Sequence, residues 1–299
     1  VLVNPPTDTT TYYVWWENSC GPSACDSVTV NVLPQPVAPV AVSVSEPAYC
    51  IGSVLNIILT ATGGSGDYVK WFEGYCGSLT VVGTGNPLVI AAPSSNKVYY
   101  ARWETSCGFS PCSPGVSVTV NPLPVASFTG LGASYCEDAL PVTLTGNYNP
   151  LGTFAGPGIT DLGNGTATFD PAAAGPGGPY TITYSYTDAN GCFDDFSATG
   201  VVRALPYVNF AGLAASYCLN ASPVPLTGNQ APFGSFSGTG ITASTNGVGT
   251  FSPAAAGVGG PYDITYSYTD IYGCSNSNTQ TTSVTALPAV SFAGLGASY

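Results

Sequence analysis

A repeat of 82 residues constrains the fold of this chain more than any other feature of its sequence. The segment "LPVASFTGLGASYC" begins at Leu123, "LPYVNFAGLAASYC" begins at Leu205, and "LPAVSFAGLGASY" begins at Leu287. Later landmarks keep the same step, because "YTITYSYTDANGC" ends at Cys192 and "YDITYSYTDIYGC" ends at Cys274. A fixed period of this length indicates one folded unit per repeat, strung along a linear array.

A different type of unit precedes these repeats. The segment "TYYVWWENSCGPSACDSVTVNVLP" at residues 11–34 matches residues 98–124, but a long strand-like stretch precedes only the second copy. We therefore expect the C-terminal part of one domain at 1–34, a complete domain of the same type at 35–122, repeats of the second type at 123–204 and 205–286, and the first strand of a further repeat at 287–299.

The alternation of side chains predicts an all-β fold of tandem immunoglobulin-like β-sandwiches. In residues 180–187, Tyr and Ile alternate with Thr and Ser, which gives one aromatic core face and one hydroxyl-rich face. Val69 and Trp71 are predicted to face a core, as are Trp16 and Trp103, and a buried Trp on the third strand is typical of immunoglobulin-like domains. The segments "DPAAAG" and "SPAAAG" predict a single helical turn. Short Pro-containing joints such as "NPLPVAS" and "RALPYVN" favour stiff connections, so we expect an extended rod.

The composition excludes several classes of function. The net charge is −12, and the four basic residues form no patch, so nucleic-acid binding is not expected. There is no histidine, so neither a Ser–His nor a Cys–His nucleophile can form, and we expect no enzyme activity and no cofactor. The sequence contains no run of eighteen apolar residues, so insertion into a membrane is not expected.

The ten cysteines indicate disulfides and an oxidising, extracellular compartment. Zinc is not favoured, because histidines at ligand spacing and a second pair of the CxxC type are both missing. Strand positions in the first type of unit, and the presence of two cysteines in each second-type repeat, lead to five expected pairs: Cys20–Cys25, Cys50–Cys76, Cys107–Cys112, Cys136–Cys192 and Cys218–Cys274. A rival pairing joins Cys192 to Cys218 across the joint. If three strands separate the two cysteines of a second-type repeat, Cys136 and Cys192 fall at opposite ends of it, and their pairing then fails.

Three positions carry alternative interpretations. Asp188 and Asp270, in "YTDxxGC", are calcium candidates, but an Asx-turn before the glycine fits better because few other acidic residues are near. Trp15 occupies the place of outward-facing Arg102 in the later copy; it either stacks on a sugar or lies at the rim of a neighbouring domain.

The stretch from "YCIGSVLNIILTATGGSGDYVKWFEGYCG" to "VYYARWETSCG" resembles the Ig-like domains of giant secreted proteins of Bacteroidota. "SYC…PVTLTG…FDPAAAG…YTITYSYTDANGC" resembles the PKD/Ig-like repeats of the same proteins. The resemblance implies export by the type IX system and a role in adhesins, gliding filaments or stalks. It also implies O-linked glycans on Thr9 and Ser27, where the family's Asp-Ser/Thr pattern is met.

Three functions follow as hypotheses. The first is a disulfide-stapled spacer in a filament, stalk or adhesin on a bacterial cell surface, with other copies or further repeats of the chain as partners. The second is an adhesin array that binds glycans or other surfaces. The third is a set of accessory modules of a secreted polysaccharide-degrading enzyme. The near-identity of the two repeats favours the first, because a spacer needs only length and toughness.

Overall fold

The computed structural model describes residues 4–291 and residue 294. The chain divides into two compact units. One contains the chain through Pro124 together with Thr187–Phe193, and the other contains Val125–Tyr186 and the chain from Asp194 onward. Secondary structure is almost entirely β, as the alternation predicted. No helix in the described residues is long and apolar enough to cross a membrane.

The first unit begins with two hairpins. Strand β1 (Thr10–Val14) pairs with β4 (Asp26–Val30), and β2 (Glu17–Asn18) pairs with β3 (Gly21–Pro22). No second sheet covers these strands within the described residues 4–34. The prediction that Trp16 is a core residue is therefore wrong, because 85% of its surface is exposed.

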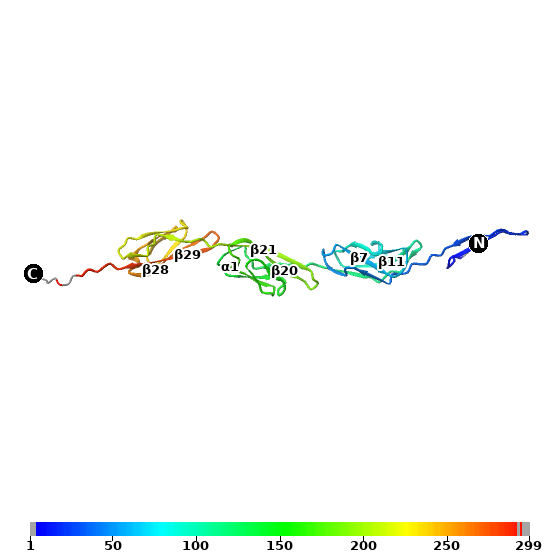
Figure 1. The fold of residues 1–299 in the computed structure, drawn as a ribbon, viewed down its shortest axis with the longest axis horizontal. Coiled ribbons are helices and arrows are strands. Elements are labelled where there is room, and N and C mark those ends of the chain that lie inside the picture. The colour runs from blue at the N-terminus through cyan, green and yellow to red at the C-terminus, as the bar shows by residue number, and fades with distance from the viewer. Residues whose placement is uncertain (1–3, 292–293, 295–299) are drawn as a thin grey trace. The chain divides into compact units, whose positions relative to one another are not determined.

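Two facing sheets follow in the same unit. One has the order β10-β7-β5 and the other β6-β13-β11-β8-β9, with β12 paired to β11. Their bounds are β5 Ala41–Val44, β6 Ala48–Cys50, β7 Asn56–Thr62, β8 Tyr68–Glu73, β9 Val81–Thr84, β10 Leu88–Ala91, β11 Lys97–Thr105, β12 Gly108–Phe109 and β13 Val116–Asn121. Strands β7 and β11 are labelled in Figure 1.

The core between these sheets follows the predicted alternation. Ile57 and Leu59 from β7 meet Val69 and Trp71 from β8, and all four are at most 1% exposed. The buried Trp71 ring also donates a hydrogen bond from Nε1 to the carbonyl of Gly85 at 2.9 Å. The predicted inward orientation of Val69 and Trp71 is confirmed.

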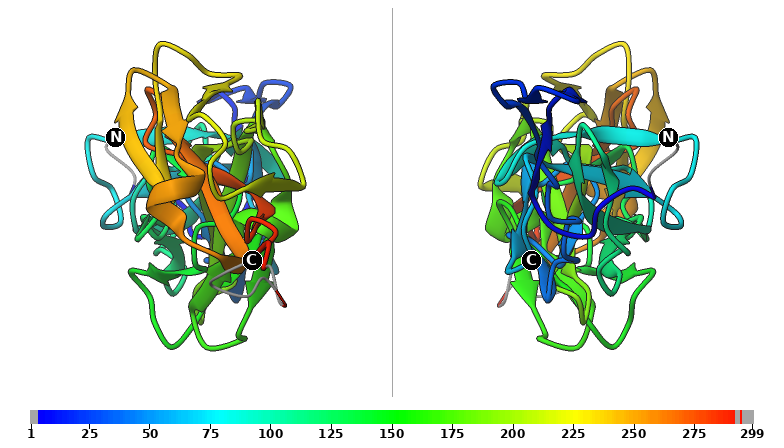
Figure 2. Two further views of the ribbon diagram at one scale, coloured as in Figure 1. Left: turned by 90° about the vertical axis from the view of Figure 1, so that its left-hand side faces the viewer. Right: turned by 90° about the vertical axis from the view of Figure 1, so that its right-hand side faces the viewer.

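The second-type repeats are sandwiches of two four-stranded sheets. In the first repeat the orders are β14-β16-β19-β18 and β15-β21-β20-β17, and in the second they are β22-β24-β27-β26 and β23-β29-β28-β25. The strands of the first are β14 Phe128–Thr129, β15 Ser134–Cys136, β16 Val142–Gly146, β17 Thr153–Ala155, β18 Ile159–Asp161, β19 Thr166–Phe169, β20 Gly177–Thr187 and β21 Phe193–Arg203. Those of the second are β22 Phe210–Ala211, β23 Ser216–Cys218, β24 Val224–Gly228, β25 Ser235–Gly238, β26 Ile241–Thr245, β27 Val248–Phe251, β28 Gly259–Thr269 and β29 Ser275–Thr285. Figure 2 shows the long strands β28 and β29, in orange and red-orange, running side by side.

A tyrosine stands at the centre of each of these sandwiches. Tyr184 and Tyr266 are fully buried, and their hydroxyl groups donate to the carbonyls of Leu151 and Phe233 at 2.7 and 2.6 Å. Gly146 lies against the Tyr184 ring so closely that a Cβ atom there would penetrate the ring's van der Waals surface. The predicted aromatic core face is thus confirmed, and glycine is required beside it.

The predicted helical turns are α1 (Pro171–Ala174) and α2 (Pro253–Ala256). The Asp170 carboxylate accepts from the amides of Ala172 and Ala173, and Ser252 caps α2 in the same place. Proline at the first helical position needs no amide partner, so these short turns are satisfied locally.

Candidate functional site: strand ends, hairpins and their disulfides

The cysteines of the second-type repeats lie on two local structures that recur. We call β6, β15 and β23 the YC strands, because each ends at a Tyr-Cys pair; their cysteines are Cys50, Cys136 and Cys218. We call residues 188–192 and 270–274 the DxxGC hairpins; each connects two long antiparallel strands and ends at Cys192 or Cys274.

Each YC strand pairs in parallel with the last strand of its own sandwich. Cys50 lies opposite Asn121, Cys136 opposite Arg203 and Cys218 opposite Thr285. The residue after each cysteine donates its amide to the opposite residue's carbonyl, at 2.9, 2.9 and 3.0 Å respectively. Each cysteine carbonyl also accepts from the amide three residues on, at 2.9–3.0 Å. The three strand ends therefore share one backbone geometry.

The hairpins are built on their aspartates. Asp188 Oδ1 accepts from the amides of Asn190 and Cys192 at 2.9 and 2.8 Å, and Asp270 Oδ1 does the same at 2.9 Å twice. Hydrogen bonding from the Cys192 amide is the main reason that the pKa of Asp188 is lowered. In both hairpins the aspartate thus holds the turn, which is the Asx-turn alternative. Among the described residues no group of three Cys, Asp or Glu side chains could hold a metal ion.

The disulfides join a YC strand to the hairpin of the following repeat. Cys50 is bonded to Cys192 and Cys136 to Cys274, with Cα atoms 5.5 and 5.4 Å apart. The hairpin cysteines are buried, at 0% and 1% exposed. Beside the Cys136–Cys274 bond, the guanidinium of Arg203 lies 4.2 Å from the centre of the Tyr272 ring in the hairpin. Arg203 is the residue opposite Cys136. A cation over an aromatic face at this distance is attractive.

These bonds correct the expected pairing within each second-type repeat. Because β21 starts at Phe193 and Cys136 lies opposite Arg203, Cys136 and Cys192 stand at opposite ends of an 11-residue strand. That separates them by about 35 Å, far beyond disulfide reach. The same geometry separates Cys218 from Cys274, so the expected pairs Cys136–Cys192 and Cys218–Cys274 are wrong. The rival Cys192–Cys218 pair is wrong too, because Cys192 is bonded to Cys50.

The expected pairs in the first type of unit are also wrong. Two strands, β13 and β11, lie between the YC strand β6 and β8, so Cys50 cannot reach Cys76 across about 14 Å. Cys76 is instead bonded to Cys112, with 6.1 Å between Cα atoms. Cys107 stays at the tip of the β11–β12 hairpin, away from Cys112. In the described part of the chain four exposed cysteines form no disulfide: Cys20, Cys25, Cys107 and Cys218. The expected Cys20–Cys25 pair is therefore not formed, because β3 lies between its members as β12 lies between Cys107 and Cys112.

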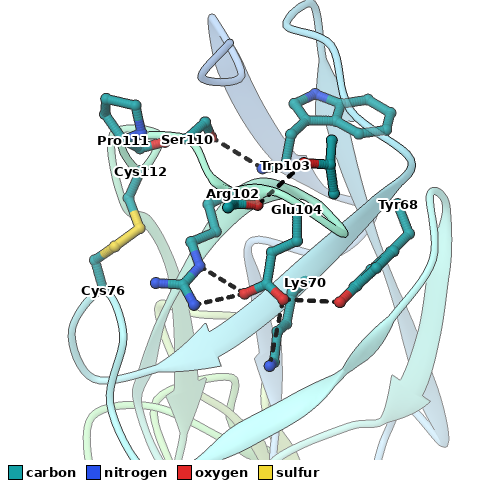
Figure 3. A network of polar contacts seen from close by, with 11 residues as sticks. Tyr68, Lys70, Cys76, Arg102, Trp103, Glu104, Ser110, Pro111 and Cys112 are labelled. Carbon is teal, nitrogen blue, oxygen red and sulfur yellow. Dashed lines mark hydrogen bonds and ion pairs between the residues drawn. A yellow bond between two sulfur atoms is a disulfide. The ribbon is translucent and has the colours of Figure 1, made fainter. Parts of the chain in front are cut away.

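A polar network close to Cys76–Cys112 was not foreseen, and Figure 3 shows it in detail. The Glu104 carboxylate, 8% exposed, accepts from Arg102 Nε at 2.7 Å and from the Tyr68 hydroxyl at 2.9 Å, with Lys70 Nζ at 3.5 Å. Burial acts to raise the pKa of Glu104, but the hydrogen bonds from Arg102 and Tyr68 together with both cations outweigh it and lower that pKa. The Arg102 guanidinium lies 3.9 Å from the Phe109 ring centre. The carboxylate is thus fully paired, and the network clamps β8 to β11.

The remaining candidate residues lie in the N-terminal hairpins. Trp15 is 51% exposed and lines a shallow hollow with Glu17, Pro22, Ser23 and Cys25. Thr9 and Ser27 are exposed, and the Thr9 hydroxyl accepts from the Val32 amide at 3.1 Å. Sugar stacking by Trp15 and glycans on Thr9 and Ser27 stay predictions.

No family model and no curated protein matches this chain. Among solved structures it is similar to a Ca²⁺-stabilized adhesin with which an Antarctic bacterium reaches out and binds ice, at 14% identity over 93% of this chain and 82% of that chain, with a TM-score of 0.37. It is also similar to part of a 1.5-MDa bacterial ice-binding adhesin, at 13% identity over 84% of this chain and 99% of that chain, with a TM-score of 0.34. The immunoglobulin domains 1–5 of Sidekick-1 match at 12% identity over 96% of this chain and 69% of that chain, with a TM-score of 0.30. These likenesses are too distant to carry any statement about function. The sheets themselves define the class: tandem immunoglobulin-like β-sandwiches cross-linked by disulfides.

Proposed function

We propose that this chain is a structural spacer in an extracellular filament, stalk or adhesin on a bacterial cell surface. The single observation that carries the proposal is the pairing of Cys50 with Cys192 and of Cys136 with Cys274. Each bond closes a loop of about 140 residues that contains a joint between two repeats. By the chain-entropy model a loop of this size contributes about 5 kcal/mol. Each of these two joints is therefore spanned by a covalent cross-link, as a structural spacer requires.

The hydrogen bonds and ion pairs of the acidic side chains support a passive role. The buried carboxylate of Glu104 is fully paired with cations and a hydroxyl, and the aspartates of the hairpins hold their own turns. None of these groups is left to act on a substrate. The resemblance of the sequence to repeats of secreted Bacteroidota proteins supports export by the type IX system, and the disulfides support an extracellular location.

The alternative is a glycan-binding adhesin array, and Trp15 is the observation that favours it. An exposed indole beside a hollow is suited to stacking on a sugar ring. A third possibility is that the chain consists of accessory modules of a secreted polysaccharide-degrading enzyme, and it would use the same Trp15 surface to bind a sugar.

A glycan-array screen of the oxidised full chain tests the proposal, with the Trp15→Ala variant as the matched control. The spacer proposal predicts equal, background-level signals for both proteins. Saturable binding that the Trp15→Ala variant loses would replace the spacer with the adhesin array.

A further inference from the structure

The exposed thiol of Cys218 lies at the end of a YC strand, and the cysteines at the ends of the other two YC strands both form disulfides. Cys50 and Cys136, at the same place on β6 and β15, are bonded to DxxGC hairpins in this structure. Cys218 ends β23 in the same way, but it is exposed and unbonded in the described part of the chain.

The backbone at Cys218 already has the geometry of the occupied strand ends. Leu219 donates its amide to Thr285 at 3.0 Å, as Glu137 donates to Arg203 at 2.9 Å. Ala221 donates to the Cys218 carbonyl at 2.9 Å, as Ala139 donates to the Cys136 carbonyl at 3.0 Å. The backbone at Cys218 therefore already matches that of the two YC strands that are bonded to a hairpin.

We infer that Cys218 is the attachment point for the DxxGC hairpin of a further repeat of this kind, and forms with its cysteine the next disulfide of a continuing series. The inference rests on the proposed spacer function and names its partner. The sequence of residues 287–299 supports this occupant, because it copies residues 205–217 in register and so begins such a repeat. Both DxxGC cysteines present in the chain are already bonded, so the hairpin must be supplied by another repeat.

The side chains around the bond set how tightly the hairpin is held. The residue opposite Cys136 is Arg203, whose guanidinium faces the Tyr272 ring of the hairpin. The residue opposite Cys50 is Asn121, and the residue opposite Cys218 is Thr285. The joint at Cys218 is thus expected to depend on its disulfide without a cation–π contact, as the joint at Cys50 does.

Formation of the bond is a two-electron oxidation. Two thiols lose their protons and two electrons, and a small-molecule disulfide such as oxidised glutathione accepts them and leaves as two thiols. The exchange passes through a mixed disulfide on the exposed Cys218, which its exposure permits.

The test extends the full chain by one repeat in register. A copy of residues 218–299 is added after Tyr299, the protein is oxidised with a glutathione buffer, free thiols are alkylated, and disulfide-linked peptides are mapped without reduction. We expect loss of the alkylated Cys218 peptide and appearance of a peptide joining Cys218 to the cysteine copied from Cys274. In the unextended chain, and in an extended chain with serine in place of that copied cysteine, Cys218 stays alkylated.

A second extension, with a copy of residues 136–217, supplies a DxxGC hairpin of different sequence and guards against a single misfolded addition. The Cys136–Cys274 peptide reports in every sample that the original repeats are folded. Persistent alkylation of Cys218 in both extended chains, or its linkage to Cys20, Cys25 or Cys107, overturns the inference. Neither result bears on glycan binding, so the spacer proposal stands or falls separately.

Discussion

The overlapping disulfides make a quantitative prediction for the length of the chain under load. When the oxidised chain is pulled from its ends and its sandwiches unfold, the shortest covalent path sets the length. That path runs from Cys50 to Cys76, crosses to Cys112, continues to Cys136 and crosses to Cys274, so it contains 50 residues of backbone where the reduced chain contains 224. Reduction should lengthen the unfolded chain by about 600 Å, at about 3.5 Å per residue.

Removal of single disulfides should have unequal effects. Replacing Cys50 and Cys192 by serine leaves the 50-residue path intact and adds no length. Replacing Cys136 and Cys274 by serine forces the path through the Cys50–Cys192 bond and then along 82 residues, a gain of about 110 Å. Removing both pairs leaves only Cys76–Cys112 and adds about 480 Å.

The assay is single-molecule force extension of the full chain, with contour lengths compared among the four proteins. The large gain on removing both pairs follows only if the two bonds protect the same stretch of chain. Equal gains from the two single removals, summing to the gain of the double removal, would refute the pairing described above.

Four further predictions concern stability. Glu104→Gln should destabilise the chain by about 1–3 kcal/mol, because Arg102 and Lys70 lose a buried charged partner; thermal melts of this variant and of the exposed control Glu46→Gln measure it. Folding lowers the pKa of Glu104 from 4.5, so its contribution to the free energy of unfolding should be complete above pH 4.5 and lost as the pH falls through the lower folded pKa. A shallower acid unfolding transition for the wild type than for Glu104→Gln would contradict this. Gly146→Ala should cost about 1–3 kcal/mol by urea unfolding, since its Cβ meets the Tyr184 ring, and a Tyr184→Leu background should relieve part of that cost; no relief would show that the ring is not the obstacle. Arg203→Ala and Tyr272→Ala should couple by about 0.5–1 kcal/mol in a double-mutant cycle, and strictly additive effects would mean that the cation–π contact contributes nothing.

Side-chain alternation was sufficient to predict the sheets. Ile182 and Tyr184 are buried where the two-residue period puts them, and the Trp71 indole lies in the core as the third-strand position indicates. Alternation failed for Trp16, because burial of a strand face needs an opposing sheet and residues 4–34 have none in the described chain. Alternation also gave no sign that Glu104 is buried, since the period gives the face of a strand but not whether Arg102, Lys70 and Tyr68 gather over it.

Disulfide pairing could not be predicted from spacing within one repeat. The sequence shows that Cys136 and Cys192 recur together, but their pairing depends on which ends of the sheet they occupy, and that depends on the parallel register of β15 with β21. The partners of Cys136 and Cys192 are Cys274 and Cys50, which lie 138 and 142 residues away in neighbouring domains, so each bond crosses a domain boundary. The useful clue was the 11-residue length of the strand between them.

The order of cysteines along the chain, Cys50, Cys136, Cys192 and Cys274, makes the two long bonds overlap. Suppose that a protease cuts the backbone once, anywhere between Cys50 and Cys274. At least one of the two bonds then still joins the fragments, and a cut between Cys136 and Cys192 leaves both in place. A chain cross-linked in this way stays in one piece after any single backbone cut in that stretch, which suits a protein exposed to proteases outside the cell.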